Sequence, residues 1–265
     1  MLFRSNYNQT PQPQGLSTHE TFGNPNLPTT KAAHYVGGYE WQITDLLFAD
    51  LQLYWNRQWD IPEFETEGDL TGEDFTFNET RRFYPEGRGR MRGLEILVRH
   101  DQGERFFGWL AYTLSRAERY DRAEDRFVLF GQDQTHNLQL VGSRRLPADW
   151  EVGCRVRFVS GNPYTPVVGS YFDARNRIYG ADLGKENSAR NAPFFQVDVR
   201  VDKKFIFDRF IMSLYADIQN LSWFFYKSPE LRVSNYNPYD IKERREDRQP
   251  ISYPFVPSVG VSAEF

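Results

Sequence analysis

The most regular feature of the chain is an alternation of apolar and polar residues at every second position. Near the carboxyl end, Val259 and Val261 alternate with Ser258, Gly260 and Ser262. The same alternation occurs in segments 35–43, 49–56, 94–99, 137–140, 150–158, 195–202 and 210–219. Successive side chains of a strand point to opposite sides, so each segment is predicted to be a β-strand with one apolar and one polar face. With Leu2–Asn8 as a short first strand and Phe106–Ser115, which is apolar on both faces, the pattern predicts about ten strands.

The lengths of the strands and of their connections decide which all-β fold is expected. Roughly 9 to 13 residues per strand exceeds the usual globular strand and suits a tilted crossing of a bilayer. Tight connections, at 44–46, 101–104, 147–149 and 208–209, alternate with long polar ones, at 9–30, 59–87, 116–132, 161–192 and 222–252. Transmembrane barrels combine short periplasmic turns with long extracellular loops, whereas a sandwich needs no such alternation. The sequence therefore predicts an antiparallel transmembrane β-barrel.

Aromatic residues and overall hydropathy fit this prediction. Aromatic side chains make up 16% of the chain, yet the mean hydropathy is −0.66. A barrel resolves this conflict, because half of each strand faces lipid and half faces a wet lumen. Candidates for the two interfacial girdles lie at predicted strand ends: Trp41, Trp59, Phe106, Trp150, Phe205, Phe207, Tyr253 and Phe265.

Charge, cysteine and histidine usage exclude several other classes. The balance of 32 Lys+Arg against 36 Asp+Glu argues against a nucleic-acid partner, because no basic track would neutralise a phosphate backbone. A single cysteine, Cys154, excludes an internal disulfide and a cysteine zinc site. The four histidines are scattered without metal-ligand spacing, so no metal site is predicted. The sequence contains no apolar run of 18 residues, so no membrane-spanning helix is predicted. The first residues show no signal-peptide pattern.

Several motifs, taken in order, resemble the barrel of TonB-dependent outer-membrane receptors. They are Phe22–Leu27 with the strand from Lys31, Gly89–Glu95, Gly108–Ser115, Asp133–Leu138, Ser160–Pro166 and Tyr215–Leu221, followed by alternating apolar residues that end on Phe265. The resemblance covers nearly the whole chain. It implies that residues 1–265 form the C-terminal part of a receptor barrel of roughly 22 strands, without the plug domain and signal peptide of the family.

The resemblance also implies function, location and partners. The protein would be a non-enzymatic outer-membrane receptor for energy-coupled uptake of a large, scarce ligand such as a metal chelate or an oligosaccharide, and would need no cofactor. Its partners would be outer-membrane lipid and lipopolysaccharide, the barrel-assembly machinery through Phe265, and the TonB complex only through the absent N-terminal region.

Two groups of residues are candidates for specific roles. In the last long loop, aromatic rings and arginines suit stacking on, and charge-assisted hydrogen bonding to, a flat anionic or phenolic ligand or lipopolysaccharide phosphates. These residues are Trp223, Phe225, Tyr226, Arg232, Tyr236, Arg244 and Arg245. The second group occupies polar strand faces, where charges would face the lumen and the plug and pair with one another: Arg155, Arg157, Asp198, Arg200 and Asp202. The acidic segment 59–87 could bind a cation or a basic ligand, but the preferred interpretation is a solvated loop.

Two alternatives remain open at this point. The first is a self-contained ten-stranded outer-membrane barrel, which has a permitted even strand number and could act as a surface protease. A ladder between Leu2–Asn8 and Tyr253–Phe265 would support it. The second is a lectin-like soluble sandwich, which detergent-free solubility with an unchanged β spectrum would favour.

Overall fold

The computed structural model describes most, but not all, of the chain. The described residues are 2–5, 27–64, 83–103, 105–122, 124–175, 177–226, 230–236, 244–250 and 254–264. Phe265, Tyr253 and most of the Phe22–Leu27 motif lie outside the described residues, as do the centres of the loops predicted at 59–87 and 222–252. None of the helices in the described part has the length and apolarity needed to cross a membrane.

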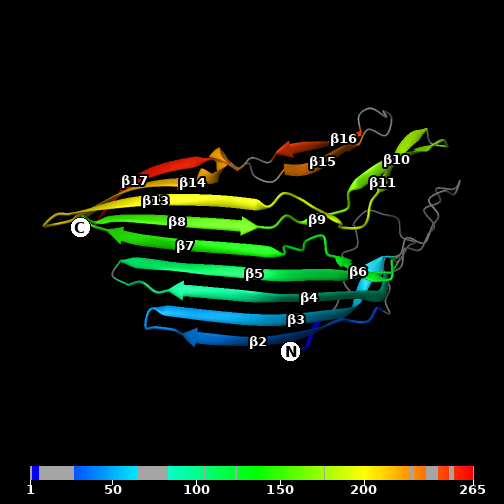
Figure 1. The fold of residues 1–265 in the computed structure, drawn as a ribbon, viewed down its shortest axis with the longest axis horizontal. Helices are drawn as coiled ribbons and strands as arrows, with labels where there is room; N and C mark the ends of the chain where they lie inside the picture. The colour runs from blue at the N-terminus through cyan, green and yellow to red at the C-terminus, as the bar shows by residue number, and fades with distance from the viewer. Residues whose placement is uncertain are drawn as a thin grey trace, which may run out of the picture. The chain divides into compact units, whose positions relative to one another are not determined.

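One antiparallel sheet dominates the structure. Its strands follow the order β1 (Leu2–Ser5), β2 (Thr30–Gln42), β3 (Leu47–Phe64), β4 (Phe83–His100), β5 (Phe106–Asp121), β7 (His136–Leu146), β8 (Trp150–Val159), β13 (Phe194–Ile206), β14 (Ile211–Gln219) and β17 (Val256–Glu264). Figure 1 shows β2 to β17 side by side in this order, and β6 (Arg126–Leu129) pairs only with β5. The path confirms the predicted antiparallel fold. Among the described strands no ladder joins β1 to β17, so the support required for a self-contained closed barrel is missing.

The register confirms the two predicted faces. Leu214 of β14 lies opposite Val261 of β17, and Ala216 lies opposite Val259. Farther along the sheet, rows such as Leu110, Leu140, Val156 and Val197 bring apolar positions of four strands together. These side chains are not gathered in a core: Val259 is 82% exposed, and in the described part of the chain Val128 is the one hydrophobic residue that is buried. An apolar surface that faces outward is what a lipid-facing sheet requires.

Tight turns join the strands at one end. One of them, the three-residue connection between β7 and β8, has positive φ angles at Ala148 (59°) and Asp149 (57°), a backbone conformation that occurs in tight hairpin connections. Between β2 and β3, the backbone N–H groups of Leu46 and Leu47 donate to the Thr44 hydroxyl at 3.3 and 3.0 Å. The predicted alternation of tight and long connections is confirmed.

Three strands are longer than predicted. β3 and β4 each have 18 residues and β5 has 16, so paired strands occupy parts of the loops expected at 59–87 and 116–132. The prediction failed there because these extensions carry charges on both faces and lack the apolar alternation used to recognise strands. Trp59, expected at a strand end, lies inside β3 for the same reason.

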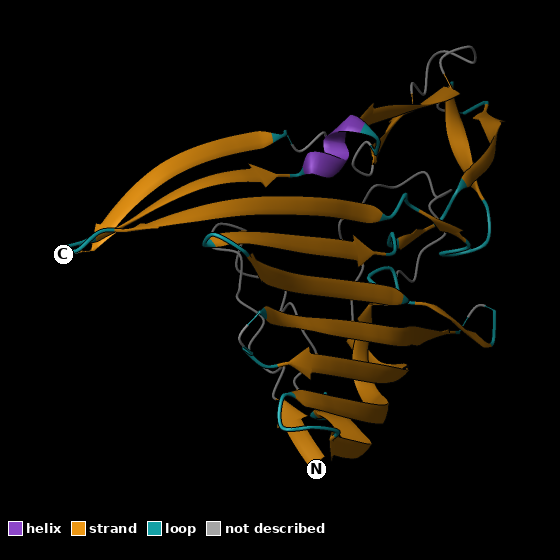
Figure 2. Cartoon of the chain, turned by 60° about the vertical axis from the view of Figure 1, so that its left-hand side comes forward, coloured by secondary structure: helices purple, strands orange, loops and turns teal. Residues whose placement is uncertain are grey.

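The long connections also contain short regular elements (Figure 2). Two-stranded ladders form between β10 (Val167–Asp173) and β11 (Ile178–Leu183), between β9 (Pro163–Tyr164) and β12 (Ala189–Arg190), and between β15 (Glu230–Tyr236) and β16 (Arg244–Pro250). The single helix of the described chain is the 3-10 turn η1 (Leu221–Phe224). Contacts divide the described residues into two units. The first unit consists of the described residues within 1–36, 54–92 and 117–128, and the second unit consists of the remaining described residues.

Candidate functional site

The polar face of β8 and β13 carries an ion pair at directly opposed positions. Arg155 and Asp198 are register partners, and the Arg155 Nε and Nη2 atoms lie 2.7 and 2.5 Å from Asp198 Oδ2. Asp198 is only 7% exposed, and its other oxygen accepts a hydrogen bond from the Gln196 amide at 2.8 Å. Such pairing stabilises a carboxylate that burial would otherwise penalise.

The neighbouring residues of this face are engaged in the same way. Arg200 holds both oxygens of Asp202 at 2.8 Å, and its Cζ atom lies 4.2 Å from the centroid of the Tyr215 ring. Arg157 lies over the Phe194 ring at 5.5 Å. Four of the five residues predicted for this wall therefore form two ion pairs, and the fifth rests on an aromatic ring. The arrangement gives a polar strand face on which both aspartates of the set are paired with an arginine.

Asp198 also fixes the start of the last long loop. The Asn220 backbone N–H donates to Asp198 Oδ1 at 2.8 Å, and Asn220 adopts a left-handed conformation with φ of 57°. Next in the chain, the fully buried Ser222 hydroxyl accepts the Val197 N–H at 3.1 Å. The chain thus turns back onto β13 directly after β14 and forms η1 there.

The first three predicted ligand residues lie together on and after η1. Phe225 and Tyr226 pack against Phe195, with ring centroids 6.4 and 5.7 Å apart, and Trp223 stays 42% exposed. The Tyr226 hydroxyl donates to the Pro193 carbonyl at 2.5 Å, and burial raises the pKa of Tyr226 above its usual value. Phe195 belongs to the apolar strand face, so these rings continue that face beyond the end of β13.

The other four predicted residues lie in the β15–β16 hairpin. The register places Tyr236 opposite Arg244 and Asn235 opposite Arg245. The positions of Arg232 and Tyr236 on β15 are four residues apart and belong to one face of the hairpin. The position of Arg245 on β16 is opposite Asn235 and belongs to the other face. The structure therefore groups the seven candidates into two sets, one on η1 and one on the hairpin.

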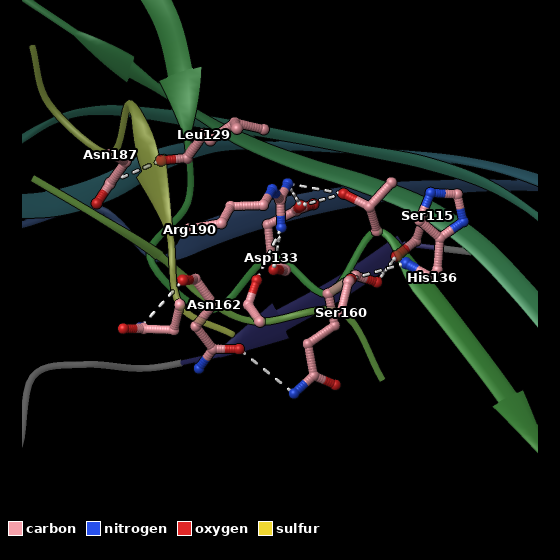
Figure 3. Close-up of polar contacts among 12 residues, drawn as sticks. Ser115, Leu129, Asp133, His136, Ser160, Asn162, Asn187 and Arg190 are labelled. Atoms are coloured by element: carbon pink, nitrogen blue, oxygen red, sulfur yellow. Dashed lines mark hydrogen bonds and ion pairs between the residues drawn. The ribbon is translucent and has the colours of Figure 1, made fainter. Parts of the chain in front are cut away.

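A polar cluster that the sequence did not predict ties four loop segments together (Figure 3). The Arg190 Nη2 atom lies 2.6 Å from Asp133 Oδ2 and 2.7 Å from the Thr135 hydroxyl. Its Nη1 atom donates to the Gly161 carbonyl at 3.0 Å. The Asp133 side chain is fully buried, whereas that of Arg190 is 32% exposed.

Further hydrogen bonds extend this cluster. The His136 N–H donates to the Ser160 hydroxyl at 3.0 Å, and the Asn187 amide donates to the Leu129 carbonyl at 2.7 Å. At Gly161 an added Cβ would lie 1.9 Å from the Asn191 carbonyl oxygen, so a side chain has no room. The motifs Asp133–Leu138 and Ser160–Pro166 therefore meet, and Arg190, which no sequence pattern marked, joins them.

Within the part of the chain that the structure describes, no group of histidine, cysteine and carboxylate side chains could hold a metal ion. What the described residues offer is a sheet with an exposed apolar face, an opposite face of paired charges, and long connections that alternate with tight turns. These features together define an outer-membrane β-barrel protein.

Comparison with protein families gives the same answer more specifically. The model of the TonB-dependent receptor-like β-barrel matches residues 2–221. The chain belongs to the TonB-dependent receptor β-barrel family and is an outer-membrane protein. Comparison with curated proteins gives no match.

Solved structures with a similar fold include receptors and a transporter. The ferric-catecholate import receptor Fiu from Escherichia coli K12 is 14% identical, with a TM-score of 0.58 over 99% of this chain and 31% of that chain. The FrpB iron transporter from Neisseria meningitidis is 15% identical, with a TM-score of 0.55 over 90% of this chain and 32% of that chain. The ferripyoverdine receptor of Pseudomonas aeruginosa is 13% identical, with a TM-score of 0.53 over 76% of this chain and 24% of that chain. These likenesses show the fold, and the aligned region spans about a quarter to a third of each relative.

Proposed function

We propose that residues 1–265 form the C-terminal part of the barrel of a receptor that takes up a large, scarce ligand across the outer membrane. The observation that carries the proposal is the family match over residues 2–221, on a sheet whose path is open at β1 and β17. An open path leaves room for further strands of a larger barrel. Energy would reach this part through the TonB complex acting on another region of the receptor, and no catalytic step belongs to its role.

Two classes of ligand remain candidates, metal chelates and oligosaccharides. Three of the similar structures are, by name, a ferric-catecholate import receptor, a ferripyoverdine receptor and an iron transporter, which favours an iron chelate. Ligand contact is proposed for the η1 set, Trp223, Phe225 and Tyr226, and for the hairpin set, Arg232, Tyr236, Arg244 and Arg245. Stacking on the exposed Trp223 ring combined with arginine charge suits a flat, anionic ligand.

Assembly partners belong to the same proposal. The carboxyl-terminal Phe265, which follows the alternating strand β17, would be recognised by the barrel-assembly machinery. The lumen-facing wall of Arg155, Arg157, Asp198, Arg200 and Asp202 would contact a plug domain.

Uptake measurements with the gene at its native locus test the proposal. Deletion should abolish accumulation of one labelled ligand class, either iron-55 chelates or labelled oligosaccharides, and the intact gene should restore it. A Trp223→Ala, Arg244→Ala, Arg245→Ala variant should restore less uptake at equal surface abundance. The matched control is Arg144→Ala, because Arg144 lies near the tight turn between β7 and β8. Unchanged uptake of both classes after deletion would contradict the proposal.

A further inference from the structure

The hairpin formed by β10 and β11 presents an exposed tyrosine ring above a glycine. Tyr171 lies opposite Gly180, and a Cβ atom added to Gly180 would lie 2.3 Å from Tyr171 Cζ, so the ring occupies the space of the missing side chain. Tyr171 is nevertheless 61% exposed, and among the described residues no aromatic or cationic side chain covers its ring. The ring is therefore backed by β11 and open to water on its other side.

A carboxylate lies on the same face of this hairpin. The register pairs Gly169 with Asp182, two positions along from the pair of Tyr171 and Gly180, so Asp182 and Tyr171 are diagonal neighbours. Diagonal neighbours of two paired strands are about 7–8 Å apart, within reach of long side chains. Asp182 is exposed, and no cation in the described part of the chain pairs with it. The two glycines contribute no side chain to the space between the ring and the carboxylate.

The polar face of the main sheet contains a similar arrangement with a cation in place. Tyr215 of β14 lies opposite Gly260 of β17, and its Cζ atom lies 2.4 Å from the position of a Gly260 Cβ. The Arg200 guanidinium covers this ring at 4.2 Å and donates to both oxygens of Asp202 at 2.8 Å. Within this protein, a tyrosine ring above a glycine and beside a carboxylate therefore holds a guanidinium group.

Hydrogen bonds fix the base of the β10–β11 hairpin. The Gly184 N–H donates to the Pro166 carbonyl at 2.8 Å, which closes the hairpin where the two strands begin and end. Asn187 donates its backbone N–H to the Thr165 hydroxyl at 3.1 Å and its side-chain amide to the Leu129 carbonyl at 2.7 Å. Because the hairpin is formed and anchored in advance, a ligand loses less free energy in ordering it.

We propose that the β10–β11 hairpin binds the guanidinium group of an arginine side chain presented by an extracellular peptide. The guanidinium stacks on the open side of the Tyr171 ring and directs its N–H fork at Asp182, as Arg200 does with Tyr215 and Asp202. A planar fork satisfies a ring and a carboxylate together, which a compact ammonium group does less well. The site selects a cation, whereas the residues proposed for uptake suit an anionic ligand, so its failure would leave the proposed function untouched.

Saturation-transfer NMR titrations test the proposal on the purified receptor, with residues 1–265 in the context of their own gene product. The probe is N-acetyl-arginine amide, and N-acetyl-citrulline amide supplies nearly the same shape without the charge. Tyr171→Ala should weaken binding of the arginine probe about two- to fivefold, the range of an exposed cation–π contact. Asp182→Asn should weaken it by up to about fivefold, and Tyr171→Phe, which keeps the ring, should retain binding.

Two control variants should leave binding unchanged. Phe172→Ala removes a ring that is 53% exposed on the other face of the same hairpin, and Asp149→Asn removes an exposed carboxylate from the tight turn between β7 and β8. Should Tyr171→Ala disturb the hairpin, Asp182→Asn still decides the question, because it changes the charge of an exposed side chain and hardly its shape. The proposal is overturned by equal binding of the citrulline probe, by unchanged affinity in Asp182→Asn, or by an equal loss in Phe172→Ala.

Discussion

Replacing Asp133 by alanine should open the extracellular loop cluster around Arg190 without unfolding the barrel. Asp133 accepts the Arg190 guanidinium at 2.6 Å and the Thr135 hydroxyl at 2.8 Å, and its side chain is fully buried. The alanine variant leaves Arg190 without its carboxylate and frees the segments that the arginine joins.

The expected magnitude follows from burial. Removing one partner of a fully buried ion pair costs about 3–5 kcal/mol, because the other charge stays desolvated. Arg190 is 32% exposed, so water recovers part of that loss, and a local cost of about 2–3 kcal/mol is expected. At 1.36 kcal/mol per tenfold, this corresponds to a change of roughly 30- to 150-fold in the local opening equilibrium.

Amide hydrogen exchange measures this opening directly. Protection should fall at His136, whose N–H bonds to Ser160, and at Asn191, whose N–H bonds to the Asn162 carbonyl. The β13–β14 ladder should keep its protection.

The matched control is Asp202→Ala, which breaks a more exposed pair with Arg200 and should cost less than about 1 kcal/mol. Unchanged protection at His136 in the Asp133 variant, or an equal loss in the control, would refute the reasoning.

Four other outcomes are expected. Val259→Arg places a charge on the lipid face and should cost about 2–4 kcal/mol in denaturant unfolding from vesicles, whereas Ser258→Arg on the polar face should cost much less; similar costs would refute the face assignment. Gly161→Ala must displace a backbone carbonyl and should cost about 1–3 kcal/mol, whereas Gly153→Ala, with its nearest atom at 3.8 Å, should not; an unaltered unfolding midpoint would contradict this. The raised pKa of Tyr226 means that its contribution to folding is complete below its unfolded pKa of about 10 and is lost as pH rises further, so near-ultraviolet absorbance should show late ionisation that Tyr226→Phe removes. The chain expressed by itself leaves the outer edge of β17 unpaired and should aggregate in detergent; a monodisperse, heat-resistant monomer would count against this.

Strands inside the bilayer could be predicted because solvent imposes a strict rule on them. Lipid on one side and water on the other force alternation, as in Leu214 and Ala216 of β14, and the register of β17 follows from it. Beyond the bilayer the rule lapses, since both faces of a strand meet water. The residues before Leu94 therefore show no apolar alternation, although they lie within β4.

Contacts between loops that are distant in the chain produce no periodic pattern in the sequence, so they could not be predicted from it. Asp133 and Arg190 are 57 positions apart, and no pattern in the sequence connects them. Within the motif Ser160–Pro166, Gly161 has no space for a Cβ. The arginine that joins this motif to Asp133 could be found only from coordinates, because loop closure depends on backbone turns that local sequence does not determine.

The extra length of β3 and β4 has a mechanical consequence. At about 3.3 Å per residue and a tilt near 40°, an 18-residue strand rises roughly 43 Å, against an apolar band of about 25 Å. A hydrogen-bonded stalk of nearly 20 Å would then separate the connecting loop from the hydrocarbon. A large ligand that reaches the outer ends of β3 and β4 would therefore meet paired strands outside the hydrocarbon, at a distance from the part of the ladder that lies within the bilayer.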